Sequence, residues 1–307
     1  MDYVLQTFGL TKLYKKNAAV SSANINICRG DIYGFVGENG SGKTTIIRLV
    51  TGLIYPKSGS YELFGIKNTD KNILNARKKI AAIVETPSVY LNMSAYDNLK
   101  LQCDLRGIKG EDKILQTLKD VGLESLYSSK KHAGDFSLGM RQRLGIAIAL
   151  IGDPEFMILD EPMNGLDPAG IVEIRELILK LNRKHGITFL ISSHILTELS
   201  LVATKYGIIS KGKIIKEITA DELKYECGKF TLIKATDMDA LYELLSRILP
   251  DNFVTVSGDT AKISGEIDLN AVTSAIIDSG NRILSINCQE TSFEEYYLST
   301  VGGNRHD

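Results

Sequence analysis

Short apolar runs are spread along the chain and are separated by segments in which apolar residues recur every three or four positions. Uninterrupted apolar runs are typical of strands buried on both faces, whereas spacings of three and four predict helices. Strands that alternate with helices predict a mainly parallel α/β sheet. The predicted strands are residues 32–36, 156–159, 188–192 and 206–210, with a helix over 171–185.

Alternation of apolar and polar residues near the N-terminus predicts two further strands, 3–10 and 23–27. A glycine-rich turn follows the strand at 32–36 and leads into a predicted helix over 45–51. From about residue 86 to 155 the pattern is helical, which indicates a helical subdomain inserted into the α/β domain. The helices predicted there cover residues 95–105, 113–121 and 138–151.

The C-terminal part has a different order of elements. A short helix over 219–225 and Gly228 mark a boundary, so we expect residues 1–226 to form one domain and residues 227–307 a smaller one. The βαββαβ order of the second domain predicts a ferredoxin-like α+β fold. Its predicted elements are strand 230–235, helix 238–249, strands 253–256 and 261–263, helix 269–277 and strand 283–288.

The bulk composition narrows the function by exclusion. The 307 residues carry a formal net charge of −1, so nothing draws the chain generally toward nucleic acid, and no nucleic acid is expected as a partner. The four cysteines form no Cys-x-x-Cys pair, which argues against a metal cluster or a disulfide framework. No apolar run approaches the roughly 18 residues of a membrane helix, and no signal-peptide core is present, so we expect a cytoplasmic protein.

The most specific motif begins directly after the strand at 32–36. Residues 37–44 read Gly-Glu-Asn-Gly-Ser-Gly-Lys-Thr and match the phosphate-binding loop G-x-x-x-x-G-K-[ST]. In this loop the glycines let backbone N–H groups face phosphate oxygens, Lys43 meets the β- and γ-phosphate charges, and Thr44 is placed to bind magnesium. The alternative is a plain glycine turn that caps a helix, and the strand–loop–helix context disfavours it.

Two carboxylates follow the buried strand at 156–159. Asp160 stands where a strand-end aspartate can hold Mg²⁺, and Glu161 stands where it can orient and deprotonate an attacking water. Acidic residues at strand ends are common, so a simple strand cap is the alternative for this pair alone. Together with the phosphate loop, the pair favours phosphoryl transfer from a nucleotide.

Over residues 3–223 the chain resembles the ATP-binding cassette (ABC) ATPases. Their signature Leu-Ser-Gly-Gly-Gln aligns with residues 136–140, where Ser137 and Gly139 match and the first, third and fifth positions differ. Residues 164–167, Asn-Gly-Leu-Asp, resemble the family's D-loop, and His194 resembles its switch histidine. The resemblance implies a P-loop NTPase (RecA-like) core with an antiparallel β edge and a helical insert, which hydrolyses ATP with Mg²⁺.

The resemblance also implies a head-to-tail pair of ATPase subunits, identical or paralogous, that holds ATP at its interface. The helix that starts at Ser137 then faces the γ-phosphate bound by the opposite subunit, and His194 senses the γ-phosphate. For His194 alone, a satisfied histidine at a strand end is the alternative. Tyr14 occupies the place of an adenine-stacking ring, with a purely structural tyrosine as the alternative. The implied ATP-binding residues are Tyr14, Gly37, Glu38, Asn39, Gly40, Ser41, Gly42, Lys43, Thr44, Thr45, Ser137, Gly139 and Asp167.

Glu85 is the sharpest departure, because most family members carry glutamine at this hinge between the core and the helical insert. A carboxylate is a charged oxygen ligand, so Glu85 becomes a candidate catalytic residue and a magnesium ligand beside Thr44 and Asp160. A solvated loop acid is the alternative. Glutamate here, followed by Thr-Pro, is similar to the bacitracin-resistance and lantibiotic-immunity branch of ABC exporters.

The expected function is therefore the ATP-hydrolysing subunit of an exporter of peptide or amphiphilic antibiotics, peripheral on the inner face of the membrane. Because no spanning helix is predicted, the permease must be a separate polypeptide. Residues 89–93 and Tyr96 either dock that permease or pack in the core. The competing function is a soluble ABC-type ATPase that acts on ribosomes or nucleic acid. Such relatives usually carry two cassettes or a long coiled coil, whereas this chain has one phosphate loop and no extended heptads.

Overall fold

The computed structural model describes residues 2–109, 111–250 and 254–302. The chain divides into two compact units, residues 1–219 and 220–307. The boundary expected after residue 226 falls at the end of the first helix of the second unit, α8 (Ala220–Glu226).

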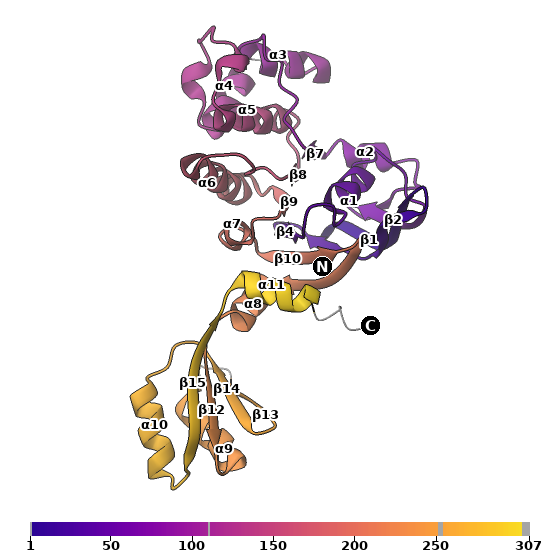
Figure 1. Ribbon diagram of the computed structural model, residues 1–307. Coiled ribbons are helices and arrows are strands. Elements are labelled where there is room, and N and C mark those ends of the chain that lie inside the picture. The colour runs from indigo at the N-terminus through magenta and orange to yellow at the C-terminus, as the bar shows by residue number, and fades with distance from the viewer. Residues whose placement is uncertain (1, 110, 251–253, 303–307) are drawn as a thin grey trace. The chain divides into compact units, whose positions relative to one another are not determined.

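A six-stranded sheet forms the centre of the first unit, in the order β11-β10-β4-β9-β8-β7 (Figure 1). All neighbours pair in parallel except β10 and β11, which confirms the predicted mainly parallel sheet. Every residue of β4, β8 and β9 is buried, which explains the apolar runs within these strands. The strands are β4 (Ile32–Val36), β7 (Ile80–Ile83), β8 (Phe156–Asp160), β9 (Thr188–Ser193), β10 (Lys205–Ser210) and β11 (Lys213–Thr219).

An antiparallel sheet lies beside it in the order β2-β1-β5-β6, with β3 paired to β1. The strand predicted over 23–27 is only partly confirmed, because β2 ends at Ala23 and the chain leaves the ladder at Asn24 and Ile25 before β3 begins at Asn26. There the Asn24 side chain accepts a hydrogen bond from Gly9 N, and Ile25 N donates to the Thr7 hydroxyl, so side chains replace ladder partners. The strands are β1 (Tyr3–Tyr14), β2 (Asn17–Ala23), β3 (Asn26–Cys28), β5 (Ser58–Leu63) and β6 (Ile66–Lys67).

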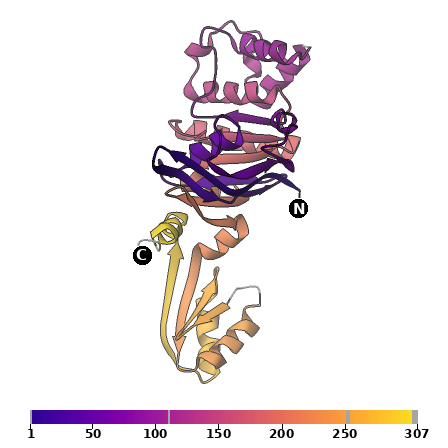
Figure 2. The same cartoon turned by 90° about the vertical axis from the view of Figure 1, so that its right-hand side faces the viewer.

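Helices pack around these sheets, and three of them gather at one end of the unit as the predicted helical subdomain (Figure 2). They are α3 (Ala95–Arg106), α4 (Glu111–Asp120) and α5 (Leu138–Leu150), and short 3₁₀ turns at Glu124–Leu126 and Ala133–Asp135 lie between α4 and α5. A buried cluster that includes Phe35, Ile46 and Tyr61 joins the two sheets to the helix after the phosphate loop. The remaining helices are α1 (Lys43–Val50), α2 (Ile73–Arg77), α6 (Pro168–His185) and α7 (Leu196–Ser200).

The second unit has the predicted βαββαβ order and an antiparallel sheet in the order β13-β14-β12-β15. Helices α9 and α10 contribute Leu241, Leu245 and Ile276 to its own buried core. Phe253, predicted as a strand residue, lies outside the described residues. The elements are β12 (Gly228–Ala235), α9 (Met238–Ile248), β13 (Val254–Ser257), β14 (Thr260–Ser264), α10 (Leu269–Asp278) and β15 (Ile283–Thr291), followed by α11 (Phe293–Gly302), which the sequence pattern did not reveal.

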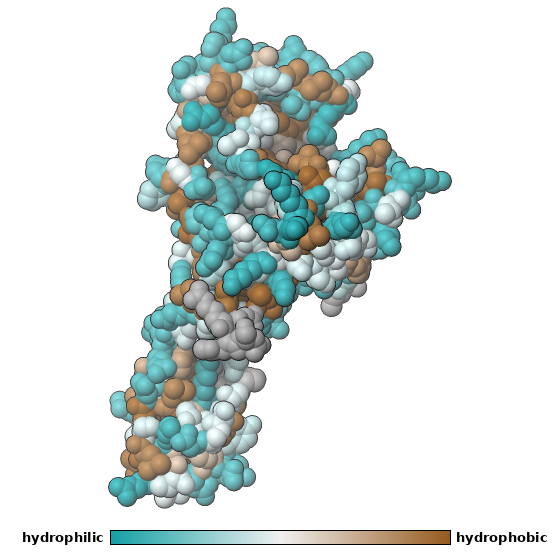
Figure 3. All heavy atoms as spheres, turned by 45° about the vertical axis from the view of Figure 1, so that its right-hand side comes forward, coloured by the Kyte–Doolittle hydropathy of each residue, from teal (hydrophilic) through white to brown (hydrophobic). Residues whose placement is uncertain are grey.

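No helix within the described residues is both long and apolar enough to cross a membrane. In Figure 3 the face turned toward the viewer shows apolar side chains in separate patches among hydrophilic ones.

Candidate nucleotide-binding site

The phosphate loop connects β4 to α1, as the sequence predicts. Gly40 and Gly42 have φ values of 80° and 112°, in the left-handed region that favours glycine. A Cβ atom at Gly42 would lie 2.6 Å from the Ala19 carbonyl oxygen, so a side chain has no room there. This turn ends at the N-terminus of α1, where backbone N–H groups and the helix dipole suit an anion.

Lys43 reaches back across this loop. Its ammonium donates to the carbonyl oxygens of Gly37 at 2.6 Å and Glu38 at 3.2 Å, and its side chain is only 5% exposed. The Ser41 hydroxyl is buried and has no hydrogen-bond partner within the described residues. Because a buried polar atom without a partner is unfavourable, this hydroxyl indicates that the loop is built to meet a polar ligand.

Asp160, at the end of β8, faces the start of α1. The Thr44 hydroxyl donates to Asp160 Oδ2 at 2.9 Å, and the Ser192 hydroxyl donates to Asp160 Oδ1 at 2.5 Å. The structure therefore brings together Thr44 and Asp160, two of the three residues predicted to bind magnesium. A hydroxyl and a carboxylate are the hard oxygen ligands that Mg²⁺ prefers.

Glu161 lies between the lysine and the histidine. Its Oε1 is 3.3 Å from Lys43 Nζ, and its Oε2 is 2.8 Å from His194 Nδ1. Its backbone is left-handed, with φ 51°, and its N–H donates to the Ser192 hydroxyl at 3.0 Å. The structure thus brings together three of the four predicted catalytic residues in one chain, with Glu161 in contact with both Lys43 and His194.

Glu85, the fourth predicted catalytic residue and third predicted metal ligand, contacts Arg48 instead. Its Oε1 accepts a hydrogen bond from Arg48 Nη2 at 2.6 Å, and its side chain is 63% exposed. Glu85 is therefore a surface carboxylate with a specific partner on α1.

The predicted adenine contact, Tyr14, is an exposed residue at the end of β1. The Lys12 ammonium lies 5.5 Å from its ring centroid, so one face of the ring already meets a cation. In the phosphate loop, Glu38, Asn39 and Gly40 are exposed, and Thr45 is half-buried in the first turn of α1.

The residues predicted to serve a second subunit form a separate hollow. Ser137 caps α5 by accepting from Met140 N at 3.2 Å, and Asp167 caps α6 by accepting from Gly170 N at 3.1 Å. Ser137, Gly139 and Asp167 line one pocket with residues of these two helix starts, and no phosphate-loop residue lines it. A complete site with both residue sets would therefore need two copies of this geometry.

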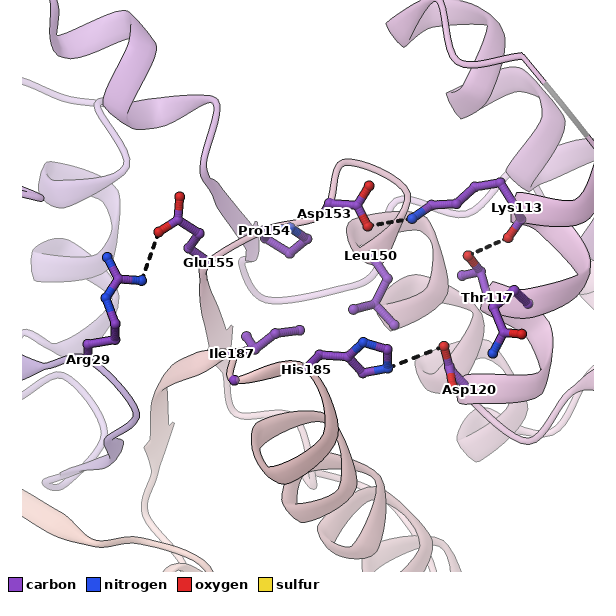
Figure 4. Close-up of a pocket in the computed structure, with 12 residues that line it drawn as sticks. Arg29, Lys113, Thr117, Asp120, Leu150, Asp153, Pro154, Glu155, His185 and Ile187 are labelled. Carbon is purple, nitrogen blue, oxygen red and sulfur yellow. Dashed lines mark hydrogen bonds and ion pairs between the residues drawn. The ribbon is translucent and has the colours of Figure 1, made fainter.

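A further cavity lies between the helical subdomain and the core, and its charges are satisfied internally (Figure 4). Asp120 on α4 meets His185 at the end of α6, 3.3 Å away. The other charged pairs lining the cavity are Arg29 with Glu155 at 2.8 Å and Lys113 with Asp153. Since the charged groups that line the cavity are paired with one another, they are not left to bind a ligand. The Asp120–His185 contact joins the helical subdomain to the core at this cavity.

Two residues of the site were missed by the sequence analysis, Ser192 and Arg48. Ser192 is opposite Asp160 in the β8–β9 register, and it belongs to the Ser-Ser run directly before His194. The sequence shows both serines. Which of them faces the carboxylates depends on which side chains of β9 point to each face of the sheet. Arg48 gave no signal, because an arginine in the last turn of a helix is ordinary.

The site combines a glycine-rich phosphate loop with an Asp–Glu pair at the end of a buried strand and a histidine after the neighbouring strand. This combination defines an ATP-hydrolysing P-loop protein. The comparisons with known proteins specify the kind. The sequence profile of the ABC transporter family matches residues 20–164. The chain is 41% identical over 305 residues to the bacitracin transport ATP-binding protein BcrA of Bacillus licheniformis, with 99% of both chains covered. It belongs to the ABC transporter family as an ATP-binding subunit with ATPase activity, which confirms the resemblance.

Other relatives and solved structures agree. The lantibiotic transport ATP-binding protein SrtF of Streptococcus pyogenes is 44% identical over 214 residues, 70% of this chain and 90% of that one. The structure of cbiO1 from Clostridium perfringens, part of the transporter complex cbiONQ, matches with a TM-score of 0.65 at 26% identity, over 82% of this chain and 97% of that one. The cassette MJ0796, a dimer bound to ADP and Pi, matches with a TM-score of 0.62 at 25% identity, over 70% and 98%.

Proposed function

We propose that this ATPase energises the export of a peptide or amphiphilic antibiotic, in self-immunity or resistance. The observation that carries this proposal is the match to a bacitracin transport subunit along the whole chain, the second unit included. A lantibiotic transport subunit matches the first unit independently. Glutamate at position 85, the feature that suggested this branch from the sequence, points to the same class of cargo.

The contacts within the site support separate roles for its residues in phosphate binding, activation of water and sensing of the γ-phosphate. Lys43 and the loop N–H groups hold the β- and γ-phosphates, and Glu161 orients the attacking water and accepts its proton. His194 Nδ1, 2.8 Å from Glu161 Oε2, fixes this carboxylate and senses the γ-phosphate. Their direct contact means that the arrival of a γ-phosphate can alter all three side chains together.

Magnesium fits the Thr44–Asp160 pair, because these two oxygen donors already lie 2.9 Å apart beside the phosphate loop. Among the described residues no group of three or more His, Cys, Asp or Glu side chains could hold a metal ion. The remaining ligands would therefore come from ATP phosphates and water, as is usual for this ion. When bound, Mg²⁺ supplies charge neutralisation at the phosphates.

Two subunits would complete each site. Ser137 at the start of α5 presents a helix N-terminus, and a dipole of this sense favours the negative γ-phosphate of a partner's ATP. Leu138 replaces the usual small residue, and a Cβ at Gly165 would lie 3.4 Å from its Cδ2, so this side chain packs toward the D-loop. The start of α5 and the D-loop therefore lie close together within each subunit.

A separate permease would dock near the hinge, which would keep the ATPase at the inner face of the membrane. Tyr90 and Leu91 are 52% and 56% exposed, so these two members of the predicted cluster do not pack in the core. A groove beside the edge strand β7, lined by Leu53, Ile83 and Ile148 among others, lies in the same unit. Exposed apolar residues beside a groove fit the insertion of an amphipathic helix.

The deciding experiment uses Glu161→Gln in cells that carry the chain together with a co-expressed permease. We expect Glu161→Gln to keep ATP binding and to lower kcat by at least about a hundredfold, because the general base is lost. Bacitracin or lantibiotic resistance should disappear with it. The matched control, Glu176→Gln on α6, alters an exposed carboxylate outside the site and should keep both activities. Recovery of the wild type on ribosomes or nucleic acid, without any resistance, would favour the non-transport function instead.

A further inference from the structure

One ion pair joins the phosphate-loop helix directly to the hinge of the helical subdomain. Arg48 Nη2 on α1 lies 2.6 Å from Oε1 of Glu85, which follows the end of β7 by two residues. The two side chains are 39% and 63% exposed, so this pair adds little to the stability of the fold. The pair matters for function because it connects the helix after the phosphate loop to the hinge, and not because of its contribution to stability.

Arg48 projects from the same face of α1 as Thr44. The two residues are four positions apart, so their side chains are neighbours about 6 Å apart along the helix axis. The Thr44 hydroxyl is the one that meets Asp160. The guanidinium that holds Glu85 is thus one helical turn beyond the candidate magnesium ligands.

Glu85 leaves the sheet at the same edge as those ligands. Strands β7 and β8 are parallel neighbours, with Ile83 opposite Leu159, so the chain reaches Glu85 beside the end of the strand that carries Asp160. Its backbone has φ 64°, a left-handed conformation that is unfavourable for a residue with a side chain. The Glu85 carboxylate has the Arg48 guanidinium as its present partner, and magnesium at the proposed Thr44–Asp160 site would be a second.

We infer that Arg48 is a positioning residue that holds the Glu85 carboxylate away from magnesium until the metal–nucleotide complex binds. This inference rests on the proposed magnesium site at Thr44 and Asp160. A guanidinium and a divalent cation both attract this carboxylate, so we expect metal binding to weaken the Arg48–Glu85 pair. Because Glu85 belongs to the hinge, this weakening would report metal–nucleotide binding to the helical subdomain.

The test measures the affinity of the ADP-bound full chain for Mn²⁺, a spectroscopic substitute for Mg²⁺, by electron paramagnetic resonance. Arg48→Met should tighten Mn²⁺ binding about two- to fivefold, the range expected from the loss of an exposed ion pair. Arg48→Lys should restore weaker binding, because an ammonium also attracts the carboxylate. Arg29→Met is the matched control, since Arg29 is similarly exposed and paired with Glu155, and it should change nothing.

Removal of a positive charge could also tighten metal binding without any role for Glu85, and the double variant separates the two causes. In the Glu85→Gln background, Arg48→Met should have no effect on Mn²⁺ affinity. The same two- to fivefold gain in that background would overturn the inference, as would no gain in the wild-type background. Failure of the wild type to bind ADP at all would instead count against the proposed function.

A second readout follows the hinge itself. The chain has no tryptophan, so Tyr90→Trp introduces a single indole into the segment after Glu85. Position 90 is anchored to α3, because Tyr90 N donates to Asn98 Oδ1 at 2.9 Å. Titration of the ADP-bound protein with Mg²⁺ should shift the indole emission, and Arg48→Met should move the midpoint to about two- to fivefold lower Mg²⁺. An emission that ignores Mg²⁺ would show that Glu85 release does not reach the hinge, against the inference.

Discussion

At the scale of single residues, one hydroxyl contacts both acidic residues at the end of β8, the side chain of Asp160 and the backbone of Glu161. Ser192 donates to Asp160 Oδ1 at 2.5 Å and accepts from Glu161 N at 3.0 Å. We expect Ser192→Ala to lower kcat about tenfold or more, because a buried hydrogen bond to a charged group contributes about 1.5–3 kcal/mol. ATP affinity should change less than about threefold, since Lys43 and the loop are untouched. Steady-state ATPase assays with separate KM and kcat values, beside equilibrium ATP binding, measure both.

Ser193 supplies the control for that prediction. It is also buried, but its hydroxyl accepts from Ile195 N at 2.9 Å, donates to the Ile195 carbonyl oxygen at 3.4 Å and contacts neither carboxylate. Ser193→Ala should therefore keep kcat within about twofold. Equal losses in the two variants would mean that the strand end, rather than the Ser192 hydroxyl, determines the rate.

Residues of the site differed in how far the sequence could predict them. Lys43, Thr44, Asp160 and Glu161 were found because the order of strand, loop and carboxylates is local in the chain. The Arg48–Glu85 contact was not found, because it spans 37 positions and depends on where α1 meets the end of β7. Local chemistry is visible in a sequence, whereas the choice between possible partners needs the packed structure.

At the scale of elements, strong local patterns were again predicted from the sequence, whereas features that depend on neighbouring elements were not. The helices of the helical subdomain and the buried strands were predicted well, because their apolar periodicity is strong. Strands β5, β6, β7 and β11 were missed, as was nearly all of β2. They carry half-exposed or polar residues, and their pairing depends on the neighbouring strand rather than on their own pattern.

The junction of α4 and α6 makes a prediction about stability. Asp120 is buried at the C-terminus of α4 and meets Lys184 at 2.7 Å and His185 at 3.3 Å in the last turn of α6. We expect Asp120→Asn to lower the free energy of unfolding by about 1 kcal/mol at pH 7, because its partners are partly exposed and can be solvated after its loss. Urea unfolding measures this. Asp153→Asn, an exposed pair on the same junction, should cost less than about 0.5 kcal/mol.

The pH dependence of this effect has a definite sign. Burial raises the pKa of Asp120, but the hydrogen bond from Lys184 and the nearby cations outweigh burial, so the pKa lies below its ordinary value. A lowered pKa in the folded state stabilises the protein above the ordinary carboxyl pKa of about 3.9, and this contribution is lost as the pH falls through the folded value. The difference between wild type and Asp120→Asn should shrink as the pH falls below about 4. A difference that grows in acid would contradict this account.

At the scale of the whole molecule, the two units have separate cores, and we expect them to unfold separately. Leu241 is fully buried in the core of the second unit, so Leu241→Ala should destabilise that unit by about 2–5 kcal/mol. ADP should raise only the transition of the first unit, because a ligand stabilises the part that binds it. Calorimetry with and without ADP assigns the two transitions. Leu298→Ala, at a 62% exposed position, should leave both almost unchanged.

The second unit contains no motif of the nucleotide site, yet the match to the bacitracin transport subunit extends through it. We therefore predict that it regulates or stabilises the pair of ATPase subunits. Residues 1–226 alone should bind ADP within about threefold of the full chain, since every predicted ATP contact lies there. In the Glu161→Gln background, where bound ATP persists, the shortened chain should form fewer dimers, as measured by light scattering at several protein concentrations. If deletion of residues 227–307 changed neither dimer formation, ATPase rate nor antibiotic resistance, the second unit would have no part in the transport cycle.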